Sequence, residues 1–468
     1  MTESAKLPLA KWVVVIAELC ALGYLIRTED LAPSGLLLLS LIGAVALFAL
    51  TSIEWPFGAL AVLVTSSVMP RFKGTVFGLH LRPEHVGIGF VAGMLLWQVL
   101  RGRMRLTLLK QRFDYFLMAY ILLNFFTSAF TSPEPRMTLR WAVMNAIVIA
   151  PYFLLRLLIT SEVAFHQAFD IMLWVGAAES AYGVICFLSN RIFATQFGME
   201  INQYGIIPGT YGTQYEPNLF GSYSACCAVM FLTLFLLGER SPWHGCGFLI
   251  TVLGAAISLS RAVILAFPVV TLVVLWVAFK RGRFQLRRIV PLATAVALLL
   301  VIFSPFLLGL LRERFSTIGV SEISSDETTA GRLVQMVVAV QDVQAHPLLG
   351  TGTASFQLLF NWLDYQGEDL GGWVGNTPLR ILHDTGVIGL TVFLLFVGSL
   401  LLTARRIIKD SSPRTGKALI ALQAGLLLYA ITFQSAEASL LAFTWIHFGL
   451  LSAAITTAQP PRSVIMNA

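Results

Sequence analysis

The polar segments that connect the apolar runs of this chain fall into two sets, and one set carries arginine with Lys73 as the exception. An arginine guanidinium is always charged and its planar fork matches the oxygens of a phosphate, whereas a lysine ammonium acts as a point charge. These connections therefore predict an anionic ligand, a phosphate or a pyrophosphate. The alternative is that single arginines reach lipid headgroups or pair with nearby glutamates. The arginines are Arg27, Arg71, Arg82, Arg136, Arg140, Arg191, Arg261, Arg312, Arg314, Arg332 and Arg380.

Two of these arginines have sequence contexts that favour a functional role. Arg261 ends a very short polar turn between two apolar runs, so its charge must lie at the edge of the apolar layer. Arg332 opens residues 331–342, which have helical continuity and apolar positions that could lie on a helix bundle. The breaker-rich sequence at 346–352 follows. The alternative for this helix is an interfacial one that simply covers the bundle.

The composition identifies the class of protein that must position these side chains. Of the 468 residues, 57% are hydrophobic and only 12% are charged, whereas a soluble globular protein carries roughly 25% charge. The chain is therefore predicted to be an all-α polytopic membrane protein. The five cysteines show no metal-ligand spacing, so we expect neither disulfide nor metal, and no other cofactor.

Apolar runs near the roughly 20 residues that a bilayer core requires predict about 14 transmembrane helices. Cytoplasmic connections retain lysine and arginine, and the basic clusters at 101–112, 280–288 and 405–417 fall on one side of the predicted membrane. Both termini are then cytoplasmic and the arginine-rich connections are external. The predicted spans are 12–26, 36–50, 57–69, 86–100, 113–130, 141–155, 169–188, 219–237, 248–259, 262–279, 289–311, 387–402, 419–433 and 440–457.

Residues 312–385 form the one long polar interval in the chain. Irregular backbone and clustered polar groups are hard to satisfy in lipid, so a membrane protein with one sizeable extramembrane segment is expected to do its chemistry there. Trp362, Tyr365 and Trp373 lie among acidic residues of this interval and could bind sugar rings. Tryptophan and tyrosine also mark membrane interfaces in general, and both interpretations stay open.

Several motifs follow one another in a specific order on the predicted external face. Ser-Arg at 260–261 precedes the Gly-Arg-led helix at 331, the sequence Pro-Leu-Leu-Gly-Thr-Gly, and then Asn376 with Gly-x-x-Gly beginning ten residues later. This order resembles the C-terminal half of the O-antigen ligase and polymerase (Wzy-type) membrane family. Glu-Pro-Asn at 216–218 resembles an acidic-Pro-Asn element of the same family. The resemblance divides the chain into an N-terminal transmembrane bundle at 1–215, a ligase/polymerase-like core at 216–405 with the external loop 312–385, and C-terminal helices at 406–468.

The resemblance implies a C-type (GT-C-like) glycosyltransferase fold in the bacterial inner membrane, with a cavity that opens to the periplasm. Such enzymes transfer a glycan from undecaprenyl pyrophosphate to an acceptor hydroxyl, without a metal or a nucleotide sugar. Arg261 and Arg332 would hold the pyrophosphate leaving group, and Asn376 would orient sugar or phosphate oxygens. Gly386 and Gly389 would permit close backbone packing. We also expect Glu216, Asn218 and Arg380 to contact substrate.

One position departs from the family pattern. The ligases carry, before the Asn, a histidine thought to assist the acceptor hydroxyl, and Gly375 stands there in this chain. Asp384 occupies the place of a common acidic residue of the family, and His383 beside it could serve as a base held by that carboxylate. His383 could equally be an interfacial packing residue. The other titratable candidates are Glu216 and Glu437.

Functions of different classes remain open. The first is an enzyme, a repeat-unit polymerase that extends lipid-linked oligosaccharide with inversion; an O-antigen ligase acting on lipid A-core is the alternative, and the missing histidine favours the polymerase. The second is a flippase or transporter, which is disfavoured because no internal repeat is evident; a scaffolding subunit is the third. Expected partners are the undecaprenyl-pyrophosphate-linked oligosaccharide, membrane lipids, and the flippase and chain-length regulator of the same pathway, with no nucleic acid.

Overall fold

The computed structural model describes residues 55–72, 74–76, 79–104, 109, 111–200, 209–238, 242–316, 327–359 and 374–458. The predicted spans 12–26 and 36–50 lie outside the described residues, as do Trp362, Tyr365 and Trp373.

The described chain is built from helices, with two short antiparallel strand pairs, β1–β2 and β3–β4. The helices are α3 Trp55–Ser67, α4 Pro83–Leu100, α5 Arg112–Phe130, α6 Pro135–Leu158, α7 Glu162–Phe193, α8 Pro217–Leu237, α9 Pro242–Ile257, α10 Arg261–Lys280, α11 Leu286–Ser316, α12 Glu327–Ala345, α13 Phe356–Leu359, α15 Thr377–Ile407, α16 Pro413–Thr432 and α17 Ala442–Ala458. The strands are β1 Gly74–Val76, β2 Leu79–Leu81, β3 Met199–Glu200 and β4 Gly209–Thr210.

Every predicted span from 57–69 onward falls on one of these helices. By length and composition, 8 of the described helices could cross a membrane, and α3, α9 and α17 are shorter apolar helices. Large apolar side chains such as Leu265, Leu272 and Trp276 are exposed along α10, as contact with lipid requires. The all-α polytopic class is confirmed, while the total of about 14 spans stays a prediction.

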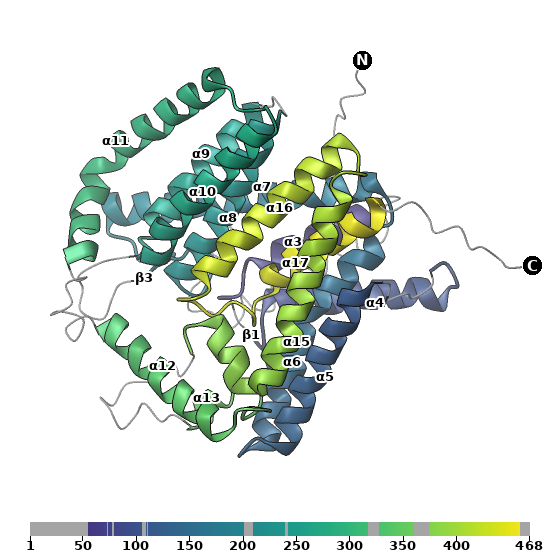
Figure 1. The fold of residues 1–468 in the computed structure, drawn as a ribbon. Helices are drawn as coiled ribbons and strands as arrows, with labels where there is room; N and C mark the ends of the chain where they lie inside the picture. Colours follow the sequence, from purple (N-terminus) through teal and green to yellow (C-terminus); the bar gives the residue numbers. More distant parts are fainter. Residues whose placement is uncertain are drawn as a thin grey trace, which may run out of the picture.

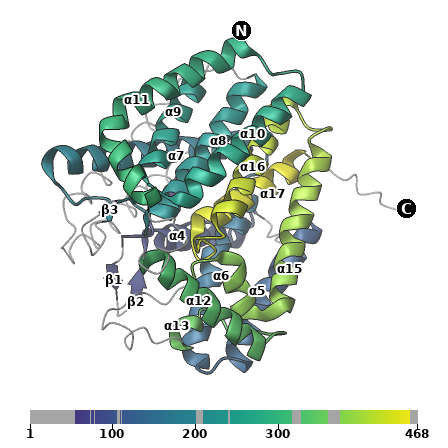
Figure 2. The same cartoon turned by 60° about the vertical axis from the view of Figure 1, so that its left-hand side comes forward.

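Helix α8 lies at the centre of the bundle and packs against α7, α9, α10 and α16. Its Cys226 and Cys227 are fully buried free thiols, as expected of packing residues. Helix α11 lies at the edge of the molecule, and α12 and α13 lie beside the start of α15 (Figures 1 and 2). The bundle thus presents the starts of α8 and α15 to the segment that carries Arg332.

Two predicted site residues begin helices. Glu216 is the N-cap residue of α8, where Pro217 sets the first turn, and Asn376 is the N-cap residue of α15. The Asn376 Oδ1 atom accepts a hydrogen bond from the Leu379 N–H at 2.8 Å, which satisfies one of the open donors of the first turn. The structure extends α11 to Ser316 and starts α15 at Thr377, so both ends of the predicted loop 312–385 are helical.

Helix α15 is interrupted at Gly386, whose φ of 65° and ψ of −172° are open to glycine and strained for other residues. The break frees backbone groups that a continuous helix would pair, and in an apolar layer these need new partners. The turn at 346–352 supplies them through four hydrogen bonds, so two motifs distant in sequence form one joint. The bonds are Thr351 N to His383 O at 3.0 Å, Gly352 N to Asp384 O at 2.9 Å, Val387 N to Pro347 O at 2.9 Å and Ile388 N to Leu348 O at 3.3 Å.

The residue that follows this turn, Thr353, ties it to α5. Thr353 donates from Oγ1 to Asn124 Oδ1 at 3.0 Å, and its N–H donates to Ser128 Oγ at 3.0 Å. These polar groups are buried and satisfy one another, which favours a single arrangement. The C-terminal end of α12 is therefore fixed between α5 and α15.

The helix predicted for residues 331–342 is confirmed by α12. Gln335 and Ala339 are buried on one face, which they share with Arg332, while Val337 and Val340 are exposed on the other. An exposed apolar face is what an interfacial helix requires. The two interpretations of this helix are therefore compatible, because it can face lipid on one side and present Arg332 on the other.

Candidate functional site

Arg332 lies where α12 meets the starts of α8 and α15. Its Nη1 atom donates to the Ser435 carbonyl oxygen at 2.7 Å, and its Nη2 atom lies 3.7 Å from Glu216 Oε2. A Cβ at Gly375 would lie 3.7 Å from Arg332 Nε, so Gly375 packs beside the arginine stem. The Arg332 and Glu216 side chains are 27% and 35% exposed. A guanidinium and a carboxylate are thus held together and remain accessible.

Glu216 has an environment that disfavours its charged form. Although the side chain is 35% exposed, the surrounding protein partly desolvates the carboxyl and raises its pKa above the ordinary value; the Arg332 guanidinium opposes this shift and Glu437 adds to it. A carboxylate with a raised pKa beside a cation can hold or release a proton nearer neutral pH than an ordinary glutamate. Glu216 therefore lies where a carboxyl could exchange a proton with a hydroxyl beside Arg332, and its role as a base stays a prediction.

Asn376 is engaged at both ends of its amide group. Besides the Oδ1 cap of α15, its Nδ2 atom donates to the Gln434 carbonyl oxygen at 2.8 Å. Asn376 therefore joins the start of α15 to the loop between α16 and α17 (residues 433–441, the α16–α17 loop). Its expected contact with substrate stays a prediction.

Arg380 lies one helical turn after Asn376 on α15 and is buried inside the protein. Its Nη1 atom donates to Glu437 Oε1 at 3.0 Å, and its Nε atom lies 3.2 Å from Asp384 Oδ2. The Arg380 side chain is 2% exposed, so its contacts are with protein groups. Asp384 is also buried and accepts the Ala354 N–H at 2.9 Å. Arg380 and Asp384 therefore connect α15 to the α16–α17 loop and to the residues that follow the turn at 346–352.

His383 is buried between two carboxylates. Its Nε2 atom lies 3.2 Å from Asp342 Oδ2, and its Nδ1 atom lies 3.3 Å from Asp384 Oδ1. The Thr351 hydroxyl lies within 3.5 Å of both ring nitrogens. The structure therefore places the predicted His-Asp pair together, with Asp342 as a third member, and both of its ring nitrogens face protein groups.

Arg261 and Asn218 lie at the same end of α8 as Glu216. Arg261 is the first residue of α10, and the turn before it packs on α8, because a Cβ at Gly221 would collide with the Ser258 side chain. Asn218 is in the first turn of α8. The short turn before Arg261 is thus confirmed, while the place of Arg261 at the membrane boundary and its role in binding stay predictions.

An aromatic residue beside Glu216 was not predicted from the sequence. Tyr215, which precedes Glu216, is exposed; its carbonyl oxygen accepts from Arg71 Nη1 and its hydroxyl accepts from Arg82 Nη1, both at 3.2 Å. Arg71 also stacks on the Tyr211 ring at 3.7 Å from its centroid. Two of the arginines predicted to be external therefore contact Tyr215, the neighbour of Glu216, although nothing in the local sequence links them to it. Arg82 also pairs with the buried Glu84 at 2.8 Å, as the alternative interpretation of single arginines expected.

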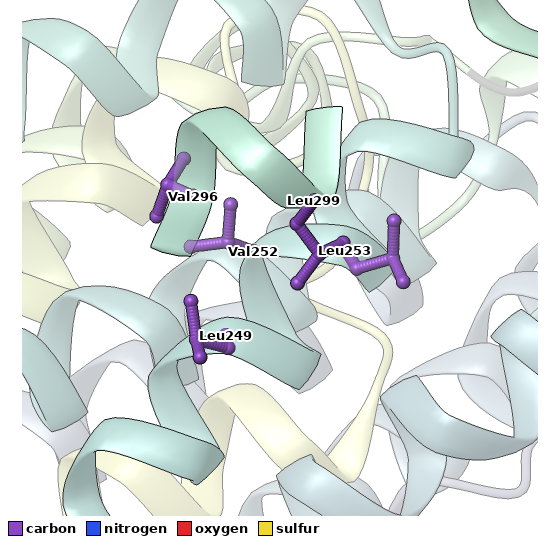
Figure 3. Close-up of a pocket in the computed structure, with 5 residues that line it drawn as sticks. All are labelled: Leu249, Val252, Leu253, Val296 and Leu299. Carbon is purple, nitrogen blue, oxygen red and sulfur yellow. The ribbon is translucent and has the colours of Figure 1, made fainter. Parts of the chain in front are cut away.

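The pocket between α9 and α11 does not compete with this site. The pocket in Figure 3 lies between α9 and α11 and is lined by Leu249, Val252, Leu253, Val296 and Leu299, so it cannot hold a charged group. Within the described ranges, no three His, Cys, Asp or Glu side chains gather in a way that could hold a metal ion. Transfer without a metal stays a prediction.

Comparison with known proteins gives one match. Residues 246–394 match the family model described as O-Antigen ligase. No curated protein matches the chain. The matched segment contains Arg261, Arg332 and Asn376, whereas Glu216 and the α16–α17 loop lie outside it. The candidate site is therefore assembled from the matched segment and from elements on both sides of it.

Proposed function

We propose that this membrane protein, whose residues 246–394 match the O-antigen ligase family model, is a glycosyltransferase that polymerises lipid-linked repeat units. The donor is an oligosaccharide on undecaprenyl pyrophosphate, and the acceptor is the non-reducing end of a second lipid-linked unit. The observation that carries the proposal is the accessible pair formed by Arg332 and Glu216 where α12 meets the starts of α8 and α15.

In the proposed reaction, the acceptor hydroxyl oxygen forms a bond to the anomeric carbon while the bond from that carbon to the pyrophosphate oxygen breaks. The hydroxyl proton passes to Glu216, and undecaprenyl pyrophosphate leaves with the bonding electrons. Arg332, with Arg261 from the neighbouring turn, stabilises the charge that grows on the leaving oxygen. A single displacement of this kind inverts the anomeric configuration.

The geometry of Arg332 supports this role. Its hydrogen bond to Ser435 goes to a neutral carbonyl, which orients the guanidinium without cancelling its charge. Its distance of 3.7 Å from Glu216 is longer than a charge-assisted hydrogen bond, so the remaining N–H groups can turn to an anionic ligand. Arg71 adds positive charge near Glu216, because it contacts the carbonyl of the neighbouring Tyr215, whereas the charge of Arg82 is paired with Glu84.

The wider arrangement that we propose is a C-type glycosyltransferase of about 14 spans in the bacterial inner membrane. Its termini are cytoplasmic and its active face is periplasmic. Residues 1–215 form the N-terminal bundle, 216–405 the catalytic core and 406–468 the closing helices. A flippase supplies the donor at this face and a chain-length regulator acts on the product.

A reconstituted assay tests the proposal. The purified protein in lipid nanodiscs is mixed with the lipid-linked oligosaccharide fraction from a strain that lacks it, and products are sized on a gel. We expect a ladder of longer lipid-linked chains that also forms in EDTA. No extension with a donor fraction of verified composition would overturn the polymerase assignment, and loss of the ladder in EDTA would overturn metal independence.

Ligase activity is the second candidate, because the matched family model is described by that activity. Gly375 favours the polymerase, since it places no titratable side chain beside Arg332. Adding lipid A-core to the same assay separates the two activities. Transfer to lipid A-core without extension of lipid-linked chains would establish the ligase instead.

Glu216→Gln is expected to change the pH dependence of transfer. A base must be deprotonated, and burial raises the Glu216 pKa, so activity of the wild type should rise with pH through a limb above the ordinary titration range of glutamate. The Gln variant should lose this limb and fall about 100-fold in rate. Asp170→Asn, in an exposed ion pair with Arg414, is the control and should keep the wild-type profile. An unchanged limb in Glu216→Gln would contradict the assignment of the base.

A further inference from the structure

The α16–α17 loop touches the candidate site from outside the matched segment. Thr377, the first residue of α15, donates two hydrogen bonds to this loop. Its N–H donates to Phe433 O and its hydroxyl donates to Ala436 O, both at 2.9 Å. Gln434 O and Ser435 O accept from Asn376 and Arg332 respectively. Consecutive main-chain carbonyls of this loop thus fix the start of α15 and the Arg332 guanidinium together.

The loop is itself held by Glu437. This side chain is 8% exposed, and its Oε1 atom accepts from Arg380 Nη1 at 3.0 Å, from Ser439 N at 2.7 Å and from Ser439 Oγ at 2.6 Å. Arg380 is anchored in turn by Asp384 at the kinked joint of α15. Removing one partner of such a buried pair leaves an uncompensated charge, so Arg380 and Glu437 hold each other and the loop in place.

We infer that Arg380 and Glu437 are positioning residues that set the direction of the Arg332 guanidinium through the α16–α17 loop. Arg380 therefore acts on substrate indirectly, in place of the direct contact expected from the sequence. The inference rests on the proposed function, because it concerns the orientation of Arg332 toward a pyrophosphate-headed lipid.

The orientation matters because the Ser435 carbonyl occupies one N–H of Arg332 and so decides where the others point. A bidentate contact with a phosphate depends on the plane of the fork. A displacement of about 1 Å in a group that positions the reacting atoms can cost about 100-fold in rate. Replacing Glu437 by a shorter or an uncharged residue would shift the α16–α17 loop and with it the Arg332 guanidinium.

A double-mutant cycle tests the inference. The probe is farnesyl pyrophosphate, a soluble pyrophosphate-headed lipid, titrated by calorimetry into the full-length protein in nanodiscs. We expect Glu437→Asp to weaken binding about 10-fold in the wild-type background, and to have no further effect in Arg332→Ala. A merely structural effect of Glu437→Asp would multiply with the loss from Arg332→Ala, and that result would overturn the inference.

Further variants distinguish a loss of affinity for farnesyl pyrophosphate from a loss of folding. Arg380→Lys retains the charge and should keep part of the affinity. Arg380→Met with Glu437→Leu removes both members of the Arg380–Glu437 pair, while Asp384 keeps His383 and the Ala354 N–H as partners, so this double variant should fold but bind as weakly as Glu437→Asp. Asp114→Asn, which disrupts a buried pair with Arg156 at the far end of α5, is the matched control and should lose stability without losing affinity.

The outcomes separate the inference from the proposed function. If Arg332→Ala binds farnesyl pyrophosphate as tightly as the wild type, the pyrophosphate assignment fails and the inference fails with it. If Arg332→Ala binds weakly while Glu437→Asp and the Arg380→Met, Glu437→Leu double variant bind normally, the inference alone fails.

Discussion

Arg332→Ala should lower glycan transfer by about 100-fold or more while the protein still inserts and accumulates normally. The guanidinium is the described positive charge that is both accessible and held beside Glu216, and alanine removes it without disturbing the apolar core. Transfer is measured in nanodiscs with the lipid-linked donor fraction, and accumulation by immunoblot of membranes. Arg261→Ala is expected to act in the same direction.

Arg332→Lys is the conservative variant of this experiment, and Arg414→Ala is its control. Lysine keeps the charge but loses the planar fork, so we expect a rate between those of the wild type and the alanine variant. Arg414 lies in an exposed ion pair with Asp170 at the start of α16, and its removal should leave the rate unchanged. Wild-type rates in Arg332→Ala would contradict the assignment of the pyrophosphate site.

Gly386→Ala is expected to destabilise the protein by about 3 kcal/mol or more. Alanine is strained at φ 65°, and its Cβ would collide with the Leu348 carbonyl, which belongs to the turn docked on the kink. Undocking this turn would release backbone groups into apolar surroundings without partners. Thermal unfolding in nanodiscs measures the loss, and transfer should fall with it because α12 loses its anchor.

Gly398 in the same helix is the matched control. A Cβ there would meet nothing within 4 Å, so Gly398→Ala should leave stability unchanged or raise it by up to about 1 kcal/mol. Equal melting temperatures for Gly386→Ala and Gly398→Ala would show that the joint between the turn and the kink is not required.

The helices could be predicted from the sequence because hydropathy and length dominate in a membrane protein. The apolar runs fall on α3 to α11 and α15 to α17, and the continuity after Arg332 gave α12. Breakers at 346–352 correctly marked a turn. Its docking on Gly386 depends on hydrogen bonds between backbone groups, which carry no side-chain pattern that a sequence could reveal.

The candidate site could be predicted only in part. Arg332, Glu216 and Asn376 do converge, whereas Arg380 faces inward. Its pairing with Asp384 four residues later is a helical spacing that the sequence contained, and it would have indicated a partner within the protein. The contribution of the α16–α17 loop could not be predicted, because its contacts with Arg332 and Asn376 come from main-chain carbonyls.

The central claim is that this protein extends lipid-linked glycans at the external face of the membrane. Its most direct test is the surface and lipid-linked glycans of a deletion strain, sized by gel and mass spectrometry, with complementation by the wild type and by Arg332→Ala. We expect single repeat units on the carrier or the final acceptor, with long chains restored by the wild type alone. Units trapped on the inner leaflet, or full-length polymer stranded on the carrier, would contradict the polymerase and establish a flippase or a ligase respectively.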